Sequence, residues 1–281
     1  MESNIIIKDE YEHLDNCIEY ILENVLSKET QQDEEYMQLQ DDYNSILINK
    51  CHCSALSCLC DVDCNHGGNY VKDSQSKELV LNSEKHQELI YECTSLCACE
   101  PEKCVNRLVQ YGPRNNLKII YSDRYQSKGL ITTEIIPKGA FICEYAGELL
   151  TLRQAQRRME ENDTNQRMNY VLSLCESASN GSRIMNKVLL TTVDPGRKGN
   201  IGRYLNHSCQ PNCQIKSVRI DCPIPKIAIF SKNLIKAGEE LCFHYNEGVI
   251  RKNQLTVQGQ KGILCLCGAE TCEKKHRNKI K

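Results

Sequence analysis

From about residue 117 onward, the chain alternates short apolar runs with polar turns. The runs are rich in β-branched and aromatic residues, and Gly, Pro and Asn separate them. They read NLKIIYS, KGAFICEYAG, NYVLSL, KVLLTTVD and PKIAIFS, at 116–122, 138–147, 169–174, 187–194 and 225–231. Runs of this kind are typical of strands, whereas TLRQAQRRMEEN at 151–162 is typical of a helix. This part of the chain is therefore predicted to be mainly β, with one helix.

The first fifty residues show a different pattern. Between residues 10 and 27 the apolar side chains recur at helical spacing with acidic residues between them; they are Tyr11, Leu14, Ile18, Ile21, Leu22 and Val25. This pattern predicts an amphipathic helix. Such a helix either packs on the rest of the protein or binds a partner, and packing is the more common role. The polar, acidic segment 28–42 is predicted to be a linker or a frayed helix end.

Composition is typical of a soluble globular protein, with 40% hydrophobic and 26% charged residues. No apolar run approaches the ~18 residues of a membrane span, and the first residues lack the basic and apolar regions of a secretory signal. We therefore expect no membrane partner. The 19 cysteines are the unusual feature. Because they are clustered and no secretory signal accompanies them, metal sites are favoured over disulfides.

Charge is distributed unevenly along the chain. The net charge is −2, yet residues 1–47 hold 13 acidic residues against only Lys8 and Lys28. The rest of the chain therefore carries +9, a balance that could suit nucleic acid. Thiolates that ligate zinc would lower this value to about +4. Direct DNA binding is therefore only weakly indicated, and no recognition helix accompanies the cysteines.

Nine cysteines between residues 51 and 104 form two dense groups. They are Cys51, Cys53, Cys58, Cys60 and Cys64, followed by Cys93, Cys97, Cys99 and Cys104. Structural zinc is four-coordinate, so nine thiolates can hold three zinc ions if three of the sulfurs bridge two ions each. The segment has little apolar sequence, and metal binding would supply most of its folding free energy. The intervening segment 65–92 is predicted to be a loop.

A third cysteine group lies near the C-terminus and contains Cys265, Cys267 and Cys272. Three ligands are one short of a structural zinc site, so the fourth must come from elsewhere. Cys209, in the stretch RYLNHSCQPNC, is one candidate, and His276 is the local alternative.

Several motifs, in order, resemble one known family. After the nine cysteines come GAFICEYAGE, GNIGRYLNHSCQPNC, EELCFHY and CLCGAETC, at 139–148, 199–213, 239–245 and 265–272. This order is similar to the pre-SET, SET and post-SET modules of histone lysine methyltransferases, in the suppressor-of-variegation group and in the SET–mariner branch. The resemblance covers roughly residues 51–275, so residues 1–50 take no part in it.

The resemblance implies the SET fold, a β-clip-type arrangement of small curved sheets with a C-terminal pseudoknot. It divides the chain into an acidic N-terminal segment at 1–50, a pre-SET zinc cluster at 51–108, a catalytic domain at 109–250, and a post-SET zinc module with a basic tail at 251–281. Three zinc ions are expected in the pre-SET cluster and one in the post-SET site. The family also implies a location in the nucleus, on chromosomes.

The methyl donor that the family uses is S-adenosylmethionine. The resemblance implies that Asn206 and His207 contact it, with Arg203 and Tyr204 beside them and Leu266 close by. The segment SKGL, which contains Lys128, Gly129 and Leu130, stands where the family has a Gly-x-Gly cofactor loop. Ser127 replaces the first glycine there, and a glycine-like backbone conformation would be costly for serine.

The acceptor that the family implies is a lysine side chain in a narrow channel. Tyr245 matches the catalytic tyrosine of the family, and Tyr170 matches a second tyrosine of the channel. Phe243 stands where relatives carry Tyr or Phe; Phe leaves room for further methyl groups, so di- or trimethylation is expected. His244 replaces the usual Asp beside Tyr245, which hints at weakened activity.

The expected substrate is the tail of histone H3 or the nucleosome. The suppressor-of-variegation group implies lysine 9, whereas the SET–mariner branch implies lysine 36, and both stay open. Two other functions also stay open: methylation of a non-histone lysine, and a zinc-stabilised chromatin scaffold without turnover. The N-terminal segment could recruit chromatin proteins.

Overall fold

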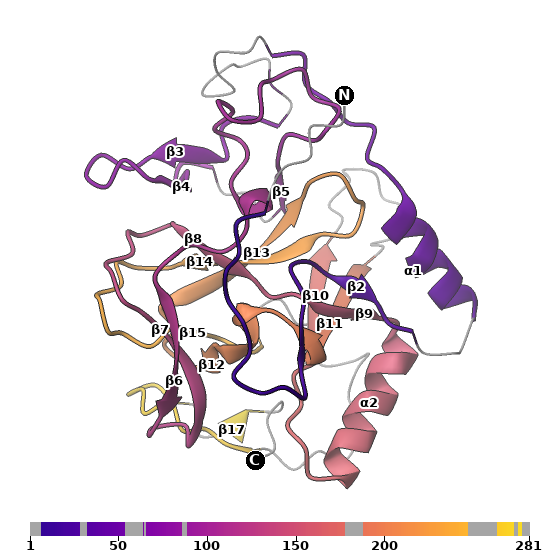
Figure 1. The fold of residues 1–281 in the computed structure, drawn as a ribbon, viewed down its shortest axis with the longest axis vertical. Coiled ribbons are helices and arrows are strands. Elements are labelled where there is room, and N and C mark those ends of the chain that lie inside the picture. The colour runs from indigo at the N-terminus through magenta and orange to yellow at the C-terminus, as the bar shows by residue number, and fades with distance from the viewer. Residues whose placement is uncertain are drawn as a thin grey trace.

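The computed structural model describes residues 7–28, 33–53, 64, 66–85, 89–177, 188–246, 263–272 and 275–276. Most of its elements are strands in small sheets, and the two α-helices of this described part lie on the same side of the molecule (Figure 1). The prediction of a mainly β fold is confirmed. None of the described helices is long and apolar enough to cross a membrane.

The largest sheet has five strands and includes the N-terminal segment. Its order is β1 (Glu19–Tyr20), β11 (Val188–Gly199), β9 (Gly147–Leu150) and β2 (Val25–Leu26), and β10 (Leu172–Ser177) pairs with β11 as well. β1 runs parallel to β11 and β2 runs parallel to β9. The other pairings in this sheet are antiparallel.

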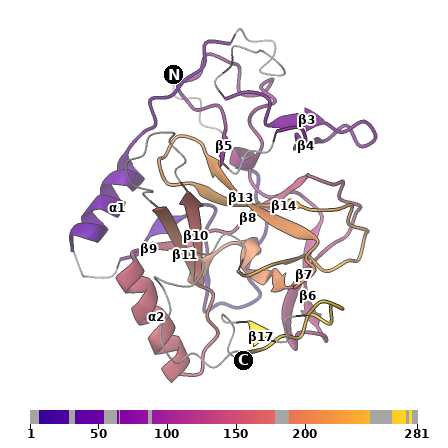
Figure 2. The same ribbon diagram turned by 180° about the vertical axis from the view of Figure 1, so that it is seen from behind.

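A second sheet has four strands. Its order is β5 (Leu89–Tyr91), β13 (Cys213–Arg219), β14 (Lys226–Ser231) and β8 (Phe141–Glu144), and Figure 2 shows it from behind. The main hydrophobic core joins the two sheets. It contains Ile142 and Ile229 from this sheet and Leu149 and Val193 from the first, all at most 1% exposed.

Four two-stranded pairs complete the part of the fold that the structure describes. They are β3 (Tyr70–Lys72) with β4 (Leu79–Leu81), β6 (Leu117–Ser122) with β7 (Ser127–Thr132), β12 (Asn206–His207) with β15 (Cys242–Phe243), and β16 (Ile263–Leu264) with β17 (Lys275–His276). Short 3-10 helices cover Val109–Tyr111 and Ile201–Tyr204. The pair β12–β15 is parallel and joins two motifs that are far apart in sequence.

The amphipathic helix predicted at 10–27 is wrong. This segment instead contains β1 and β2, and a turn at Asp15 precedes β1, where the Asp15 carboxylate accepts the N–H of Cys17 at 3.0 Å. Leu14 is 68% exposed, so the apolar residues do not form one buried stripe. Helical spacing expresses only a local preference, which hydrogen bonds to the edges of an existing sheet outweigh.

The linker predicted at 28–42 is also corrected by the structure, because it contains most of helix α1 (Glu34–Asn44). The carboxylate of Asp33 caps this helix by accepting the N–H of Tyr36 at 2.9 Å. The hydroxyl of Tyr36 donates to the carbonyl of Ser27, and that of Tyr43 donates to the carbonyl of Asn24. Two tyrosines therefore attach an otherwise acidic helix to the strand segment before it.

The loop predicted at 65–92 is likewise wrong, because it contains three strands. β3 and β4 form a hairpin, and β5 joins the four-stranded sheet parallel to β13. Contacts of Tyr70 help to explain why this segment has regular structure. Tyr70 is 1% exposed, and its hydroxyl donates to the Glu92 carboxylate at 2.8 Å. The segment is too short and polar to show strand periodicity, so its order comes from contacts with the rest of the chain.

The helix predicted at 151–162 is confirmed as α2 (Leu152–Thr164). Thr151 and Gln154 form a capping box at its start. Its Arg158 is buried and bonds the carboxylates of Glu148 at 2.7 Å and Asp194 at 2.9 Å. The two acids stand opposite each other on β9 and β11, so the guanidinium ties the helix to the sheet.

Replacing Arg158 by Ala is expected to lower the free energy of unfolding by about 3–5 kcal/mol, because two buried carboxylates lose their counter-charge. Urea unfolding at neutral pH measures this loss. Arg153→Ala serves as the matched control on the same helix, since Arg153 is 74% exposed and 3.7 Å from Asp33. The control should stay within about 0.5 kcal/mol of wild type; equal losses in both variants would contradict the expectation.

Candidate active site

Two motifs meet in the parallel pair β12–β15. Asn206 and His207 of β12 lie opposite Cys242 and Phe243 of β15. Tyr245 follows two residues later, and its backbone N–H donates to Nδ1 of His207 at 3.1 Å. The pairing therefore brings the predicted cofactor residues directly beside the predicted catalytic tyrosine.

Tyr245 forms one wall of a narrow pocket with aromatic sides. The pocket is lined by Tyr145, Asn169, Tyr170, Val171, Leu172, Arg203, Leu205, Phe243 and Tyr245. The Tyr245 hydroxyl donates to the carbonyl oxygen of Leu205 at 3.0 Å, and the Tyr145 hydroxyl donates to the carbonyl oxygen of Tyr170 at 2.6 Å. The three residues predicted to act on lysine, Tyr245, Tyr170 and Phe243, thus line the same pocket.

Burial keeps two phenols of this pocket neutral. The pKa of Tyr245 lies well above its usual value because burial disfavours the phenolate, and the neighbouring Tyr145 adds to the effect. Burial likewise raises the pKa of Tyr145, with a further contribution from Asp194. At physiological pH Tyr245 is therefore a neutral hydroxyl, which cannot act as the base that deprotonates an amine.

A second cluster fixes the orientation of Asn206. Its side-chain amide donates to the Lys128 carbonyl at 3.2 Å and to Oε1 of Glu240 at 2.8 Å. Glu240 is held in turn by the hydroxyl of Ser122 at 2.8 Å. A Cβ atom on Gly129 would lie 2.4 Å from Glu240 Oε1, so a larger residue here would displace the carboxylate that holds Asn206. Because both amide contacts use nitrogen, the carbonyl oxygen of Asn206 is turned the other way, towards Ser127.

The segment SKGL does not need a glycine at its first position. Ser127 begins strand β7, and the left-handed residue before it is Gln126, with a φ of 49°. The expected backbone cost at Ser127 is therefore wrong, because extended backbone suits any residue. Leu130 is fully buried in the main core, so only its backbone is available to a ligand.

The predicted residues Arg203 and Tyr204 are held by contacts on several sides. The Arg203 guanidinium lies 4.4 Å from the ring centre of Tyr170 and 5.2 Å from that of Tyr204, which are cation–π contacts. His13 lies 2.9 Å from the Tyr204 hydroxyl through Nδ1 and 3.0 Å from the Gly199 carbonyl through Nε2. Because a carbonyl only accepts, Nε2 carries the proton and Nδ1 accepts from the Tyr204 hydroxyl. The N-terminal segment thus supports the predicted cofactor wall.

The C-terminal cysteines meet Cys209. The sulfurs of Cys209, Cys265, Cys267 and Cys272 all lie within 4.8 Å of one another. Cys209 Sγ and Cys265 Sγ are 3.9 Å apart, close to the ~3.8 Å edge of a tetrahedron with Zn–S bonds of ~2.3 Å. Leu266 packs, half-buried, against this group. The alternative ligand, His276, has its side chain outside the described residues.

The described cysteines between residues 51 and 104 also gather in one place. Of the nine, Cys58 and Cys60 lie outside the described residues; the others are Cys51, Cys53, Cys64, Cys93, Cys97, Cys99 and Cys104, and none forms a disulfide. They fall into sets that share Cys51 and Cys93, as bridging sulfurs would. The Cys51 and Cys93 sulfurs are 3.8 Å apart, which again fits the edge of a zinc tetrahedron.

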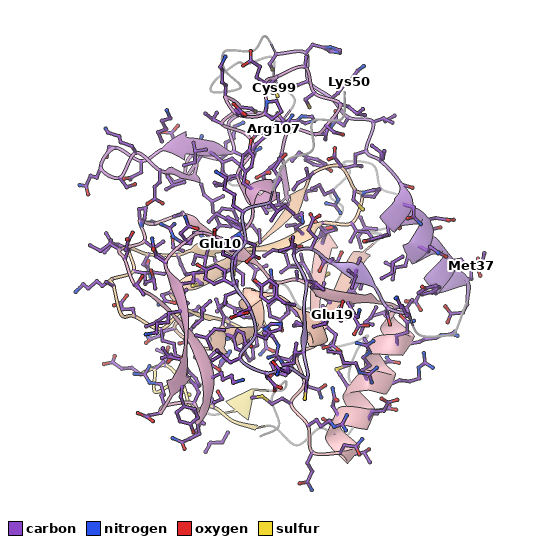
Figure 3. The ribbon with its side chains drawn as sticks, viewed as in Figure 1. Glu10, Glu19, Met37, Lys50, Cys99 and Arg107 are labelled. Atoms are coloured by element: carbon purple, nitrogen blue, oxygen red, sulfur yellow. The ribbon has the colours of Figure 1, made fainter. Side chains whose placement is uncertain are left out.

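Buried donors surround the pre-SET sulfurs. Arg107 is 2% exposed, and its Nη2 lies 3.6 Å from Cys99 Sγ. Figure 3 labels both residues at the same end of the molecule. His66 joins Cys51, Cys93 and Cys97 in one group, with Nδ1 3.6 Å from Cys97 Sγ. Hydrogen-bond donors of this kind stabilise thiolates, and thiolates are zinc ligands. The ligand chemistry of both cysteine groups therefore suits zinc.

Comparison with known proteins shows to which family the chain belongs. Residues 127–246 match the SET domain. The histone-lysine N-methyltransferase SETMAR of cattle (Bos taurus) is 38% identical over 240 residues, which cover 82% of this chain and 75% of that protein. The chain belongs to the SET-domain lysine methyltransferase family. The crystal structure of the human SETMAR methyltransferase domain matches this SET-domain protein with a TM-score of 0.71 and 32% identity, over 95% of this chain and 91% of that chain.

A structure of Arabidopsis thaliana SUVH6 in complex with SAM matches the same SET-domain protein with a TM-score of 0.67 and 29% identity. The match covers 96% of this chain and 51% of that one. SAM is bound in that neighbour, and by its family this SET-domain protein is a lysine methyltransferase. The expected SET fold and family are confirmed, and the non-catalytic scaffold is no longer needed as an alternative.

Sequence reasoning missed four residues of this SET-domain site. Tyr145 lies inside the motif GAFICEYAGE and Glu240 inside EELCFHY, so the motifs contained them without indicating their contacts. His66 follows the fifth cysteine by two residues, which was a usable signal for the metal cluster. His13 carried no signal at all, because its partners are 186 and 191 residues away.

Proposed function

We propose that this enzyme transfers methyl groups from S-adenosylmethionine to a lysine of histone H3, at lysine 9 or lysine 36, and can proceed to di- or trimethyllysine. The main support for this proposal is the pocket lined by Tyr145, Phe243 and Tyr245. Its sides are aromatic, and the Leu205 carbonyl and the Tyr245 hydroxyl lie together on its wall. Such a pocket fits the long, thin apolar stem of lysine and offers oxygen atoms to its amine.

The pocket favours the neutral form of the amine. Lowering the pKa of a free lysine from about 10.4 to 7 corresponds to roughly 4–5 kcal/mol. Among the described residues the pocket lining contains no carboxylate, and its ionised group is the cation of Arg203. Desolvation and a like charge both lower a lysine pKa. The lining also offers no base, so the proton passes to water before the amine is enclosed.

The residues present fit the donor as well. S-adenosylmethionine supplies an electrophilic methyl group on a sulfonium. We propose that the carbonyl oxygen of Asn206, oriented by Glu240, accepts from the donor's ammonium group. Lys128 and Arg203 both lie close enough to His13 to lower its pKa, after the larger effect of burial, and the Asp15 carboxylate lies near the same two cations. We propose that these cations attract the carboxylate of the donor. His207, Tyr204, Gly129, Leu130 and Leu266 would complete the surroundings of the donor.

The polarised methyl group needs acceptors along its path. The Tyr245 hydroxyl donates its proton to the Leu205 carbonyl, so towards the amine or the methyl C–H groups it acts as an acceptor. In-line transfer between a held amine and a held donor depends mainly on geometry. Tyr245 would therefore act by positioning, in agreement with its neutral state.

A substrate in the nucleus, on chromosomes, follows from the proposed activity. Methyl transfer from radiolabelled S-adenosylmethionine to recombinant nucleosomes tests it, with nucleosomes that carry single Lys→Arg substitutions at lysine 9 or lysine 36 of H3. Loss of label with one substitution identifies the target lysine. Equal labelling with both substitutions would contradict the two proposed sites, and no labelling of any nucleosome would favour a non-histone lysine.

Phe243 is expected to set the degree of methylation. It is 1% exposed, and its ring lies 5.9 Å from that of Tyr145 and 4.9 Å from that of Tyr245. In Phe243→Tyr the new hydroxyl can hold a water molecule in the space that further methyl groups need. Mass spectrometry under excess donor should then show monomethyl product where wild type gives di- or trimethyl product. Phe230→Tyr, in the second hydrophobic cluster, is the control; an unchanged product in Phe243→Tyr would contradict this role.

A further inference from the structure

His66 lies among the sulfurs of the cysteine cluster between residues 51 and 104. It is 3% exposed, and a ring nitrogen lies within 4.8 Å of the sulfurs of Cys51, Cys93 and Cys97. These four residues form a set of four possible ligands in the described part of the chain. A structural zinc ion takes four ligands, and three cysteines with one histidine are a common combination.

The distances within this set suit bonds to one metal ion. Nδ1 of His66 lies 3.6 Å from Cys97 Sγ. At a tetrahedral zinc ion, a nitrogen at ~2.0–2.1 Å and a sulfur at ~2.3 Å lie ~3.6 Å apart. The sulfurs of Cys51 and Cys93 lie 3.8 Å apart, which fits the edge between two Zn–S bonds. One ion can therefore bind both the imidazole and the sulfurs.

A hydrogen bond from His66 to a thiolate is the alternative role, but other donors already serve the Cys97 sulfur. The backbone N–H groups of Cys51 and Thr94 lie 3.4 Å and 3.2 Å from it. A thiolate that binds one zinc ion has two lone pairs left, and these two donors use them. An imidazole N–H would be a surplus donor there, whereas an imidazole lone pair can bind the metal ion itself.

The backbone around His66 is fixed by protein contacts. The side-chain amide of Asn69 donates to the His66 carbonyl and, at 3.0 Å, to the Tyr91 carbonyl. The N–H of Gly67 donates to the Cys64 carbonyl at 3.1 Å. The ring atom Nε2 is buried and has no hydrogen-bond partner among the described residues. The sulfurs are therefore the polar groups that account for the position of this ring.

We propose that His66 is a tenth ligand of the zinc cluster and binds the same ion as Cys51, Cys93 and Cys97. The number of shared sulfurs supports this role. Nine thiolates fill the twelve positions of three zinc ions when three sulfurs bridge, whereas ten ligands need two bridges. Among the described residues two sulfurs, those of Cys51 and Cys93, belong to more than one set. The ion between them would then have one neutral nitrogen ligand in place of a fourth sulfur.

Cadmium NMR of the full-length protein tests this bond directly. Zinc is exchanged for an NMR-active isotope of cadmium, which couples through the metal–nitrogen bond to the ring protons of a histidine ligand. We expect one cadmium signal to correlate with the ring of His66 in wild type and to lose this correlation in His66→Asn. Cadmium signals without any histidine correlation, or a correlation that persists in His66→Asn, would overturn the proposal.

Two variants separate a ligand from a hydrogen-bond donor. His66→Cys removes the ring but offers a thiolate to the metal, whereas His66→Asn keeps an N–H donor and is a poor zinc ligand. We expect His66→Cys to keep its zinc and His66→Asn to release one zinc ion to a chelator at least ~10-fold faster than wild type. Wild-type retention of zinc in His66→Asn would overturn the proposal. If neither variant folds by circular dichroism, the cadmium spectrum of wild type decides.

His52→Ala is the matched control for zinc release. His52 stands between two cysteines of the cluster, yet it is exposed and belongs to none of the possible metal-binding groups. Its zinc content and release rate should equal those of wild type, and equal losses in His52→Ala and His66→Asn would contradict the role of His66 as a ligand. These measurements follow the metal alone, so the expected cadmium correlation without methyl transfer to any lysine would refute only the proposed function.

Discussion

Replacing Tyr245 by Phe is expected to lower kcat for methyl transfer by about 100-fold or more, while the Kd for S-adenosylmethionine changes less than about threefold. The hydroxyl contacts the Leu205 carbonyl at 3.0 Å inside a buried pocket. Its loss leaves that carbonyl without its donor and removes an acceptor beside the amine. A misplacement of reacting groups by about 1 Å costs on this scale.

Single-turnover kinetics and isothermal titration calorimetry measure the two quantities for Tyr245→Phe. Tyr121→Phe is the matched control, because Tyr121 is 62% exposed and its hydroxyl lies 3.5 Å from Gln126. The control should behave as wild type. If Tyr245→Phe keeps wild-type kcat, or loses affinity for the donor as strongly as it loses turnover, the positioning role is refuted.

Replacing Cys209 by Ser is expected to remove about one zinc ion per chain and to lower activity at least 10-fold. Serine is a poor zinc ligand, and the three remaining tail cysteines leave the tetrahedral site incomplete. The described cysteines between residues 51 and 104 share no sulfur with this group, so their metal should remain. Activity is expected to fall because Cys209 is only two residues from His207, which we propose lies beside the methyl donor.

Elemental analysis of the purified protein, relative to sulfur, gives the metal content. Cys17→Ser is the control, since Cys17 is exposed and belongs to neither cysteine group. Chelation of wild type should also lower activity, and re-addition of zinc should restore wild type but not Cys209→Ser. An unchanged metal content in Cys209→Ser would show that the fourth ligand is another residue.

Those parts of the fold that depend on the local pattern of residue types could be predicted from the sequence. The strand runs such as PKIAIFS became strands because β-branched and apolar residues suit a buried sheet. Coordination number required a fourth ligand for the three tail cysteines and left Cys209 and His276 as candidates, and the structure places Cys209 beside them. Neither argument needed long-range information.

Other parts depend on contacts that no local pattern contains. Residues 10–27 have helical spacing, yet they pair with β11 and β9 because those strands offer unused hydrogen-bonding edges. The Glu240–Asn206 bond joins residues 34 apart, and nothing in either motif indicates it. Ser127 was misjudged because the resemblance suggested a glycine conformation that strand β7 does not use.

The placement of β1 and β2 has a consequence for how the largest sheet ends. A strand with free N–H and C=O groups can accept a strand from another molecule, which is how sheets grow and proteins aggregate. Here β2 covers β9, and β1 covers the last residues of β11. Segments from the N-terminal part of the chain thus form two-residue edge strands of this sheet, and so short an edge offers a foreign strand few hydrogen-bonding groups.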